Sequence, residues 1–303
     1  MLLSDAINGY LLDAKSRRLS PNTLRDYGNT FHKFVLLMGS TAEFEAITIP
    51  DIRQFLASHP QVKSKTIRNY HCALSALWQW AKLEGIVPVN IIRDVKAPRA
   101  DSRVIVPFTV PEIRAMLRAA VKTTGIYSGK EVRVKLVNAA RNKAVVLLLL
   151  DTGLRASELC NAKIEDCDLQ ESRIKVFGKG RKERIVEFSP ITGRAIWRYL
   201  AERKGCTKED WLFLTDEGHK MRRTSLRLLI GRIGERAGVK GAHPHRWRHT
   251  FAVMALINGM DAFTLQSSLG HSSMDIVGRY LNVAQVDTGR IQRRASPVAG
   301  LGS

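Results

Sequence analysis

Residues 144–159 read Ala-Val-Val-Leu-Leu-Leu-Leu-Asp-Thr-Gly-Leu-Arg-Ala-Ser-Glu-Leu and decide the fold of the second half of the chain. The first seven are apolar without a break. A bilayer span needs roughly 20 such residues, so the run predicts a buried helix, which we expect over residues 139–151. Gly153 can end that helix. A short helix over residues 156–162 then leaves Arg155 at a helix start, where its side chain and nearby N–H groups can face an anion.

Extended structure is expected after this turn. Residues 173–177 and 184–188 alternate apolar and polar side chains, and residues 178–183 between them carry Lys179 and Lys182. The pattern predicts a β-hairpin in an otherwise helical domain. Further helices are expected over residues 193–203, 223–237, 244–258, 261–269 and 272–281.

Helix caps and apolar spacing predict an all-α first domain. Ser20 before Pro21 is a good N-cap, and Ser64 offers another for a helix that Gly85 ends. The expected helices cover residues 4–16, 21–38, 48–59 and 64–84. The predicted fold class is therefore mainly α: an N-terminal helical bundle joined to an α+β domain with a small β-hairpin.

The best candidate for an interdomain linker is a basic stretch that contains Pro98 and Pro107. Both prolines interrupt helices, and no apolar period survives between them. We predict a helical domain at residues 1–97, a linker at 98–107, and a second domain with a polar C-terminal tail at 108–303.

The balance of charge favours a polyanionic partner. The 303 residues include 48 Lys and Arg against 28 Asp and Glu, which gives a formal net charge of +20 and a pI near 10.2. Such an excess attracts nucleic acid, although a merely basic protein is compatible with it. Hydrophobic residues make up 45%, enough for one or two cores.

The N-terminus and the cysteines indicate a cytoplasmic protein. Residues 1–5 lack the basic stretch and apolar core of a signal peptide, and no apolar run is long enough for a membrane span. The four cysteines form no Cys-x-x-Cys pair, so reduced thiols are expected and a zinc site is not. They are Cys72, Cys160, Cys167 and Cys206.

Two motifs could gather positive charge around one phosphate. Attack on a phosphodiester requires fixed cationic donors, and a guanidinium can bind two oxygens at once. Arg155 and Arg248 are the candidates. His245 lies three residues before Arg248 on a helix opened by Pro244, so the two are expected on one face. Each motif is weak evidence when taken alone. Glu158, one helical turn after Arg155, is expected to hold hydrogen bonds near Arg155 without reacting.

Tyr280 is a candidate nucleophile, although core tyrosines are more common. Ile276 and Val277 are expected to form the buried face of its helix. A phenol has a pKa of about 10, so a reacting tyrosine needs a base or nearby cations. His271 lies nine residues earlier, after a glycine that can present the imidazole from a loop.

Together these motifs resemble the active site of the tyrosine recombinase, or phage integrase, family. The resemblance is close from about residue 108 to 280 and diffuse before it, where the layout is similar to two-domain Xer recombinases. Residues 285–303 do not match the short Xer tail. The motifs lie at residues 152–159, 178–180, 245–249, 269–271 and 278–280.

The resemblance implies a mechanism and a role for each residue. Arg155, His245, Arg248 and His271 would bind and activate the scissile phosphate, Lys179 would be the general acid, and Tyr280 would attack. Lys182 is the competing choice for the acid. The family forms a 3′-phosphotyrosyl link and passes through a four-way junction held by a homotetramer on double-stranded DNA. It needs no metal or other cofactor, and accessory proteins are compatible with it.

Contacts to DNA are also expected from the first domain. Lys63, Lys65 and Arg68 lie at a helix start, away from its apolar face, where they could reach phosphates. A solvated polar face fits the same pattern equally well. The openings of this helix and of the helix after Ser20 resemble the family's DNA-facing elements, which implies that Asn22 and Thr23 also contact DNA.

Two other functions share these features. A type IB topoisomerase would use nearly the same residues to relax supercoils, and a non-catalytic DNA-binding regulator could keep the fold. The simple recombinase layout of the first domain argues against the former, and the complete set of six residues argues against the latter. His243 and His245 faintly resemble the paired histidines of metal-dependent relaxases, but Pro244 fits poorly and no third ligand is evident.

Overall fold

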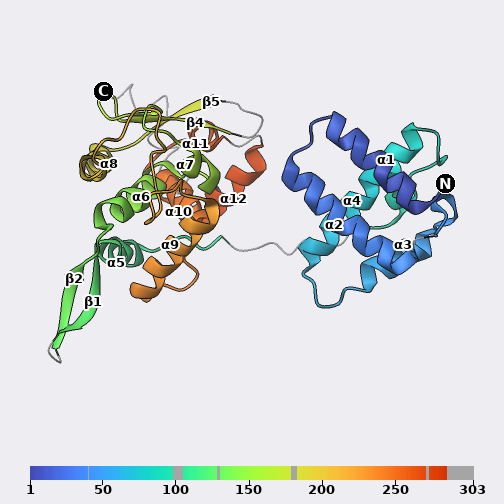
Figure 1. Ribbon diagram of the computed structural model, residues 1–303, viewed down its shortest axis with the longest axis horizontal. Helices are drawn as coiled ribbons and strands as arrows, with labels where there is room; N and C mark the ends of the chain where they lie inside the picture. The colour runs from blue at the N-terminus through green and yellow to red at the C-terminus, as the bar shows by residue number, and fades with distance from the viewer. Residues whose placement is uncertain (40, 98–104, 128–129, 179–182, 271–272, 285–303) are drawn as a thin grey trace, which may run out of the picture. The chain divides into compact units, whose positions relative to one another are not determined.

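The computed structural model describes residues 1–39, 41–97, 105–127, 130–178, 183–270 and 273–284. The chain divides into two compact units, Met1–Arg103 and Val104–Ser303. The predicted fold class is confirmed, because both units are mainly helical and the second carries small sheets (Figure 1). The linker predicted at residues 98–107 stays a prediction, since residues 98–104 lie outside the described residues.

The first unit contains the four expected helices. Ser20 caps the second helix, where its Oγ accepts a hydrogen bond from the Thr23 backbone N–H at 3.1 Å. The cap expected at Ser64 is wrong: Lys63 is the N-cap and Ser64 is already helical. The helices are α1 (Leu3–Ser16), α2 (Pro21–Met38), α3 (Ile49–Ala57) and α4 (Ser64–Leu83), with 3-10 turns at Phe44–Ala46 and Ile91–Asp94.

Aromatic side chains hold this unit together. Phe34, Phe44, Phe55 and Trp78 are at most 1% exposed. The ring centroids of Phe44 and Trp78 lie 4.5 Å apart, and those of Phe34 and Phe55 lie 5.0 Å apart. Large buried rings contribute much of the stability of a small helical domain, so this unit has a core of its own.

The residues Thr109-Val110-Pro111-Glu112 predict a capped helix at the start of the second unit, and the structure has this helix. The Thr109 backbone N–H donates to Glu112 Oε2 at 2.7 Å, and the Glu112 N–H donates back to Thr109 Oγ1, which forms a capping box. The helices of this unit are α5 (Val110–Val121), α6 (Ala139–Thr152), α7 (Ala156–Asn161), α8 (Pro190–Glu202), α9 (Arg223–Arg236), α10 (Pro244–Ile257), α11 (Ala262–Leu269) and α12 (Met274–Ala284).

Two small antiparallel sheets accompany these helices. The expected hairpin is confirmed as β4 (Arg173–Phe177) and β5 (Glu183–Glu187), joined at the edge by β3 (Cys167–Asp168) in the order β3-β4-β5. The second hairpin, β1 (Lys122–Tyr127) and β2 (Lys130–Lys135), was not expected. Val132 and Val134 on it are 37% and 49% exposed. Residues 131–135 do alternate polar and apolar side chains, but the partner strand at residues 122–127 has no such alternation and contains Gly125, so the sequence pattern of the hairpin is incomplete.

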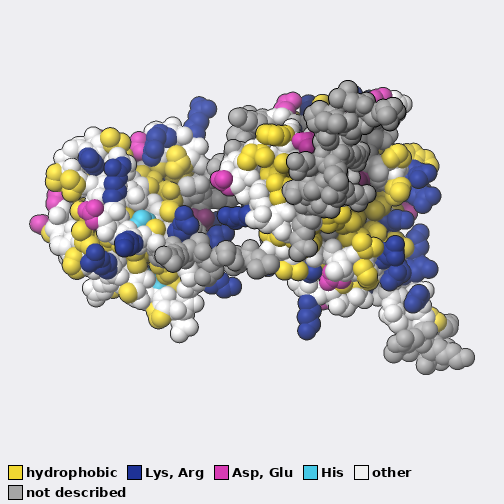
Figure 2. Space-filling view, turned by 180° about the vertical axis from the view of Figure 1, so that it is seen from behind, with side chains coloured by type: hydrophobic (Ala, Val, Ile, Leu, Met, Phe, Trp, Pro, Cys, Tyr) yellow, Lys and Arg dark blue, Asp and Glu magenta, His cyan; other side chains and the backbone are white. Residues whose placement is uncertain are grey.

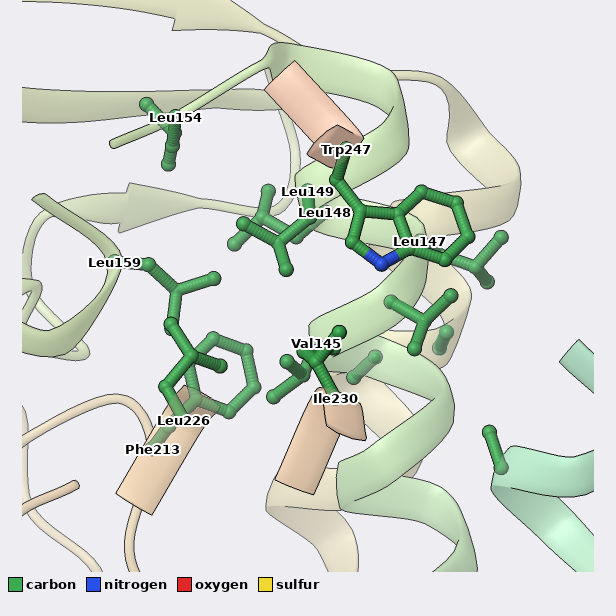
Figure 3. Close-up of a cluster of buried hydrophobic side chains, with 14 of the residues drawn as sticks. Val145, Leu147, Leu148, Leu149, Leu154, Leu159, Phe213, Leu226, Ile230 and Trp247 are labelled. Carbon is green, nitrogen blue, oxygen red and sulfur yellow. The ribbon is translucent and has the colours of Figure 1, made fainter. Parts of the chain in front are cut away.

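Helix α6 lies at the centre of the second core. Figure 3 shows Val145, Leu148 and Leu149 of this helix packed among side chains from other elements, including Leu159 of α7 and Trp247 of α10. Residues 144–149 of α6 are apolar and buried on every side of the helix, so the end of α6 is fixed in position. In the described parts of the chain, no helix has both the length and the apolarity to cross a bilayer.

Candidate active site

The turn after α6 positions Arg155. Gly153 adopts a left-handed conformation (φ 60°) at the C-terminus of α6, and its N–H donates to the Leu149 carbonyl at 3.1 Å. A Cβ on Gly153 would overlap the Phe251 ring and lie within 2.9 Å of Leu269. Since a side chain here would collide with α10 and α11, glycine lets the turn pack closely against both helices.

Arg155 is the N-cap residue of α7 and is held on two sides. Its Nη1 donates to Glu158 Oε1 at 2.8 Å, and its backbone N–H donates to Glu158 Oε2 at 2.7 Å. Its Nη2 donates to the Gly270 carbonyl at 2.9 Å. The side chain is 36% exposed, so the guanidinium is both oriented and accessible to a ligand.

A second arginine completes the network around Glu158. Arg184 of β5 donates through Nη1 and Nη2 to the two Glu158 oxygens, each at 2.8 Å, and through Nε to the Ser268 carbonyl at 2.9 Å. Burial raises the pKa of Glu158, but the hydrogen bonds from Arg184 and Arg155 outweigh it and leave the pKa below its ordinary value. The expectation that Glu158 holds a hydrogen-bond network is confirmed.

Arg184 was not among the candidate residues, although the strand pattern contained a signal for it. Period two places Arg184 on the same face of β5 as the buried Val186. A charged side chain on the inward face of a strand needs a partner of opposite charge, and Glu158 is that partner.

Arg248 is the most deeply buried of the candidate residues that carry charge. It is 2% exposed, and its Nη1 and Nη2 donate to the carbonyls of Gly153 and Leu269 at 2.8 and 2.7 Å. Burial, together with the smaller effect of the charge of Arg155, lowers the pKa of its guanidinium to about 10, so Arg248 stays protonated at neutral pH. Arg248 and Arg155 therefore bind the consecutive carbonyls of Leu269 and Gly270, which brings the two guanidinium groups together at the end of α11.

Tyr280 lies beside these arginines on α12. It is 1% exposed, and its hydroxyl is 2.9 Å from Nδ1 of His249. Burial raises the pKa of Tyr280, while the charges of Arg248 and Arg155 lower it in part. Val277 is buried as expected, but Ile276 is 38% exposed, so its assignment to the buried face is wrong.

Two histidines extend along one side of α10. His245 is exposed in the first turn, and its ring centroid lies 4.2 Å from that of His249 in an edge-on arrangement. His245 and Arg248 thus differ in burial, because only Arg248 points into the unit. His249 was not among the candidate residues, although its spacing of four residues from His245 places both on one helix face.

The remaining candidate residues are placed as follows. Lys179, Lys182 and His271 lie outside the described residues. Lys63, Lys65, Arg68 and Asn22 are exposed on the first unit, and Thr23 is half-buried. Figure 2 shows Lys and Arg side chains on the visible surface of both units. In the described part of the chain, no three His, Cys, Asp or Glu side chains are grouped as metal ligands.

Comparison with known families covers both units. Residues 112–286 match the Phage integrase family, and residues 7–85 match the family described as Phage integrase, N-terminal SAM-like domain. The first match spans more than half of the chain, and the two together reproduce its two-part organisation.

Full-length relatives and solved structures agree with these matches. The chain is 38% identical over 296 residues to a tyrosine recombinase XerC of Staphylococcus carnosus, with 96% of each chain covered. It is 29% identical over 299 residues to a XerC of Staphylococcus epidermidis, with 97% of each covered. The structure of the Tn1549 transposon integrase with transposon right end DNA shares the fold, at a TM-score of 0.76 and 21% identity, covering 98% of this chain and 100% of that one. The chain therefore belongs to the phage integrase family and is a tyrosine recombinase, an enzyme of site-specific recombination.

Proposed function

We propose that this enzyme cleaves and rejoins double-stranded DNA through a covalent bond between Tyr280 and a 3′ phosphate. The Tyr280 oxygen attacks the phosphorus, the bond from phosphorus to the 5′ oxygen breaks, and Lys179 gives a proton to that oxygen. A 5′ hydroxyl from a second strand then reverses the step. One phosphodiester replaces another of similar energy, so the exchange needs no energy-rich cofactor.

This proposal rests on one observation: the guanidinium groups of Arg155 and Arg248 lie together beside Tyr280. Two guanidinium groups fixed on neighbouring carbonyls can bind the non-bridging oxygens of one phosphate as their charge grows in the transition state. His245 and His271 are proposed as further donors to the same phosphate. Glu158 and Arg184 act through Arg155 as positioning residues.

We also propose the wider setting of the reaction. Lys63, Lys65, Arg68, Asn22 and Thr23 contact the DNA backbone, and paired exchanges pass through a four-way junction held by a homotetramer in the cytoplasm. Accessory proteins remain compatible with this setting. Support comes from the exposed cations on α4 and from solved relatives bound to DNA, such as XerH with a palindromic difH substrate.

Covalent capture tests the role of Tyr280. The protein is incubated with a pool of nicked duplexes of randomised sequence, and DNA joined to protein is recovered and sequenced. Tyr199→Phe is the control, because Tyr199 is also buried and its hydroxyl accepts a hydrogen bond from the Leu214 N–H. We expect both the wild type and Tyr199→Phe to form an adduct. Tyr280→Phe should form none while still binding the recovered DNA. An adduct formed by Tyr280→Phe would remove Tyr280 from its role.

The recovered sequence also separates recombination from supercoil relaxation. Plasmids with two copies of the sequence should exchange strands between the copies. Relaxation of a supercoiled plasmid without any strand exchange would instead favour a topoisomerase.

A further inference from the structure

The described contact of the Tyr280 hydroxyl is with His249, one helical turn beyond His245. His249 Nδ1 and Tyr280 Oη are 2.9 Å apart, and the ring centroids are 5.6 Å apart with an interplanar angle of 54°. The distance is that of a normal hydrogen bond. Both residues belong to the same chain and the same compact unit, so the pair exists without a second subunit.

The Tyr280 hydroxyl needs a proton acceptor in order to react. Burial keeps its pKa above the ordinary value despite the nearby charges of Arg248 and Arg155. The phenol is therefore protonated at neutral pH, and a protonated phenol is a weak nucleophile. Its proton must leave as the bond from oxygen to phosphorus forms.

His249 is in the right state to accept that proton. Burial, together with the smaller effects of the neighbouring His245, His243 and Arg248, lowers the pKa of His249 to about 4. The imidazole is therefore neutral at pH 7. In the tautomer with its hydrogen on Nε2, the lone pair of Nδ1 faces the Tyr280 hydroxyl, which donates the hydrogen bond.

Bound DNA should strengthen this base. The positive charge of Arg248 is one reason why the pKa of His249 is low. A phosphate held by Arg155 and Arg248 brings negative charge beside the imidazole, which favours the imidazolium. His249 is thus neutral before DNA binds and becomes more basic when the substrate is in place.

We propose that His249 is the general base of strand cleavage. As Tyr280 Oη bonds to phosphorus, its proton passes to His249 Nδ1, while the 5′ oxygen leaves with a proton from the general acid. In the rejoining step the imidazolium returns the proton to the Tyr280 oxygen as that oxygen leaves phosphorus. This inference rests on the proposed role of Tyr280, and it gives His249 a role separate from that of His245, which is exposed and placed to meet the phosphate.

The test measures single-turnover adduct formation on the captured nicked duplex across pH 6–10. His249→Asn is the main variant, because the amide oxygen can still accept the Tyr280 hydrogen bond but cannot take up a proton. General bases contribute about 100- to 10,000-fold, so we expect a loss of at least about 100-fold at pH 7 with DNA binding retained. The rate of the variant should then rise about tenfold per pH unit, as the phenolate fraction does below the phenol pKa, while the wild-type rate stays nearly constant.

His245→Asn is the matched control for this pH dependence. The charged and titratable groups around His249 are His243 at the N-cap of α10, His245 and Arg248 on α10, and Tyr280 on α12. Arg248 and Arg155, at the start of α7, also act on Tyr280. A variant that loses only a hydrogen bond to phosphate should be slower at every pH and keep the wild-type slope. A His249→Asn variant that cleaves like the wild type at pH 7, or whose deficit is the same at every pH, would overturn the proposal.

A substrate with sulfur in place of the 5′ bridging oxygen separates base from acid. Sulfur leaves without a proton, so this substrate should restore Lys179→Ala but leave His249→Asn slow at pH 7. Restoration of His249→Asn would place His249 on the leaving-group side and reject the base role. Loss of the adduct in Tyr280→Phe together with normal cleavage by His249→Asn would reject this inference alone, whereas an adduct in Tyr280→Phe would reject the proposed function.

Discussion

Glu158 shows how one buried carboxylate can orient two arginines. Its side chain is 1% exposed and accepts hydrogen bonds from Arg155 and Arg184. Removing its charge leaves two cations with a weaker partner. The arrangement therefore links the geometry of the proposed phosphate site to the stability of the fold.

We expect Glu158→Gln to lower the free energy of unfolding by about 1–3 kcal/mol at pH 7, because a buried charged hydrogen bond is weakened. The folded-state pKa of Glu158 is lowered, so the stabilisation is present above the unfolded pKa of about 4.3 and is lost as pH falls through the folded value. The difference between wild type and variant should shrink below about pH 4. Urea unfolding at pH 7, 5 and 3.5 measures it.

A carboxylate on the surface provides the control. Glu171 is exposed, and Glu171→Gln should change the free energy of unfolding by less than about 0.5 kcal/mol. If the Glu158→Gln difference is equally large at pH 3.5 and pH 7, the ion-pair explanation is wrong.

The conformation of the turn between α6 and α7 depends on Gly153. We expect Gly153→Ala to be destabilising by about 2–4 kcal/mol, because a Cβ adds strain at positive φ and overlaps Phe251. Strand cleavage should fall as well, since Arg155 and the carbonyl bonded to Arg248 move with the turn. Thermal unfolding and adduct formation measure the two effects.

Gly231→Ala is the comparison within the same unit. Gly231 lies in α9, and a Cβ there would have no neighbour within 4 Å. Alanine is the better helix former by about 1 kcal/mol, so this variant should be as stable as the wild type or slightly more stable. Equal destabilisation by both substitutions would mean that the Gly153 turn has no special role.

Local chemistry explains which elements the sequence could predict. The Thr109 capping box, the Ser20 cap and the Gly153 stop each depend on a few neighbouring residues, so these helix ends were found from sequence. The β1–β2 hairpin was missed because only its second strand alternates apolar and polar residues, over few positions. The burial of Arg248 and the contact between His249 and Tyr280 arise from packing between segments far apart in sequence, which no local pattern encodes. Family motifs selected Arg155, Arg248 and Tyr280 as candidates. The sequence contained weak signals for Arg184 and His249, but only the structure gives their partners, Glu158 and Tyr280.

The two units have separate cores, and we propose that each makes a different kind of contact with DNA. The second unit holds the fixed cations of the candidate active site, where position to within a fraction of an ångström decides the chemistry. The first unit offers exposed cations at the start of α4, whose contribution depends on charge and little on exact placement. The net charge of +20 adds long-range attraction to both.

This division predicts how salt affects binding. Replacing Lys63, Lys65 and Arg68 together by Ala should weaken binding to the captured duplex and to unrelated duplex by similar factors, because phosphate contacts carry no sequence information. Each cation removed from a phosphate should reduce the slope of log K against log salt by about 0.9, so the triple variant should reduce it by up to about three. The control variant replaces Lys15, Arg53 and Lys82 by Ala and so has the same net charge as the triple variant. These three residues are also exposed on the first unit. If the control changes the slope as much as the triple variant, binding follows total charge and the start of α4 has no special place at the DNA.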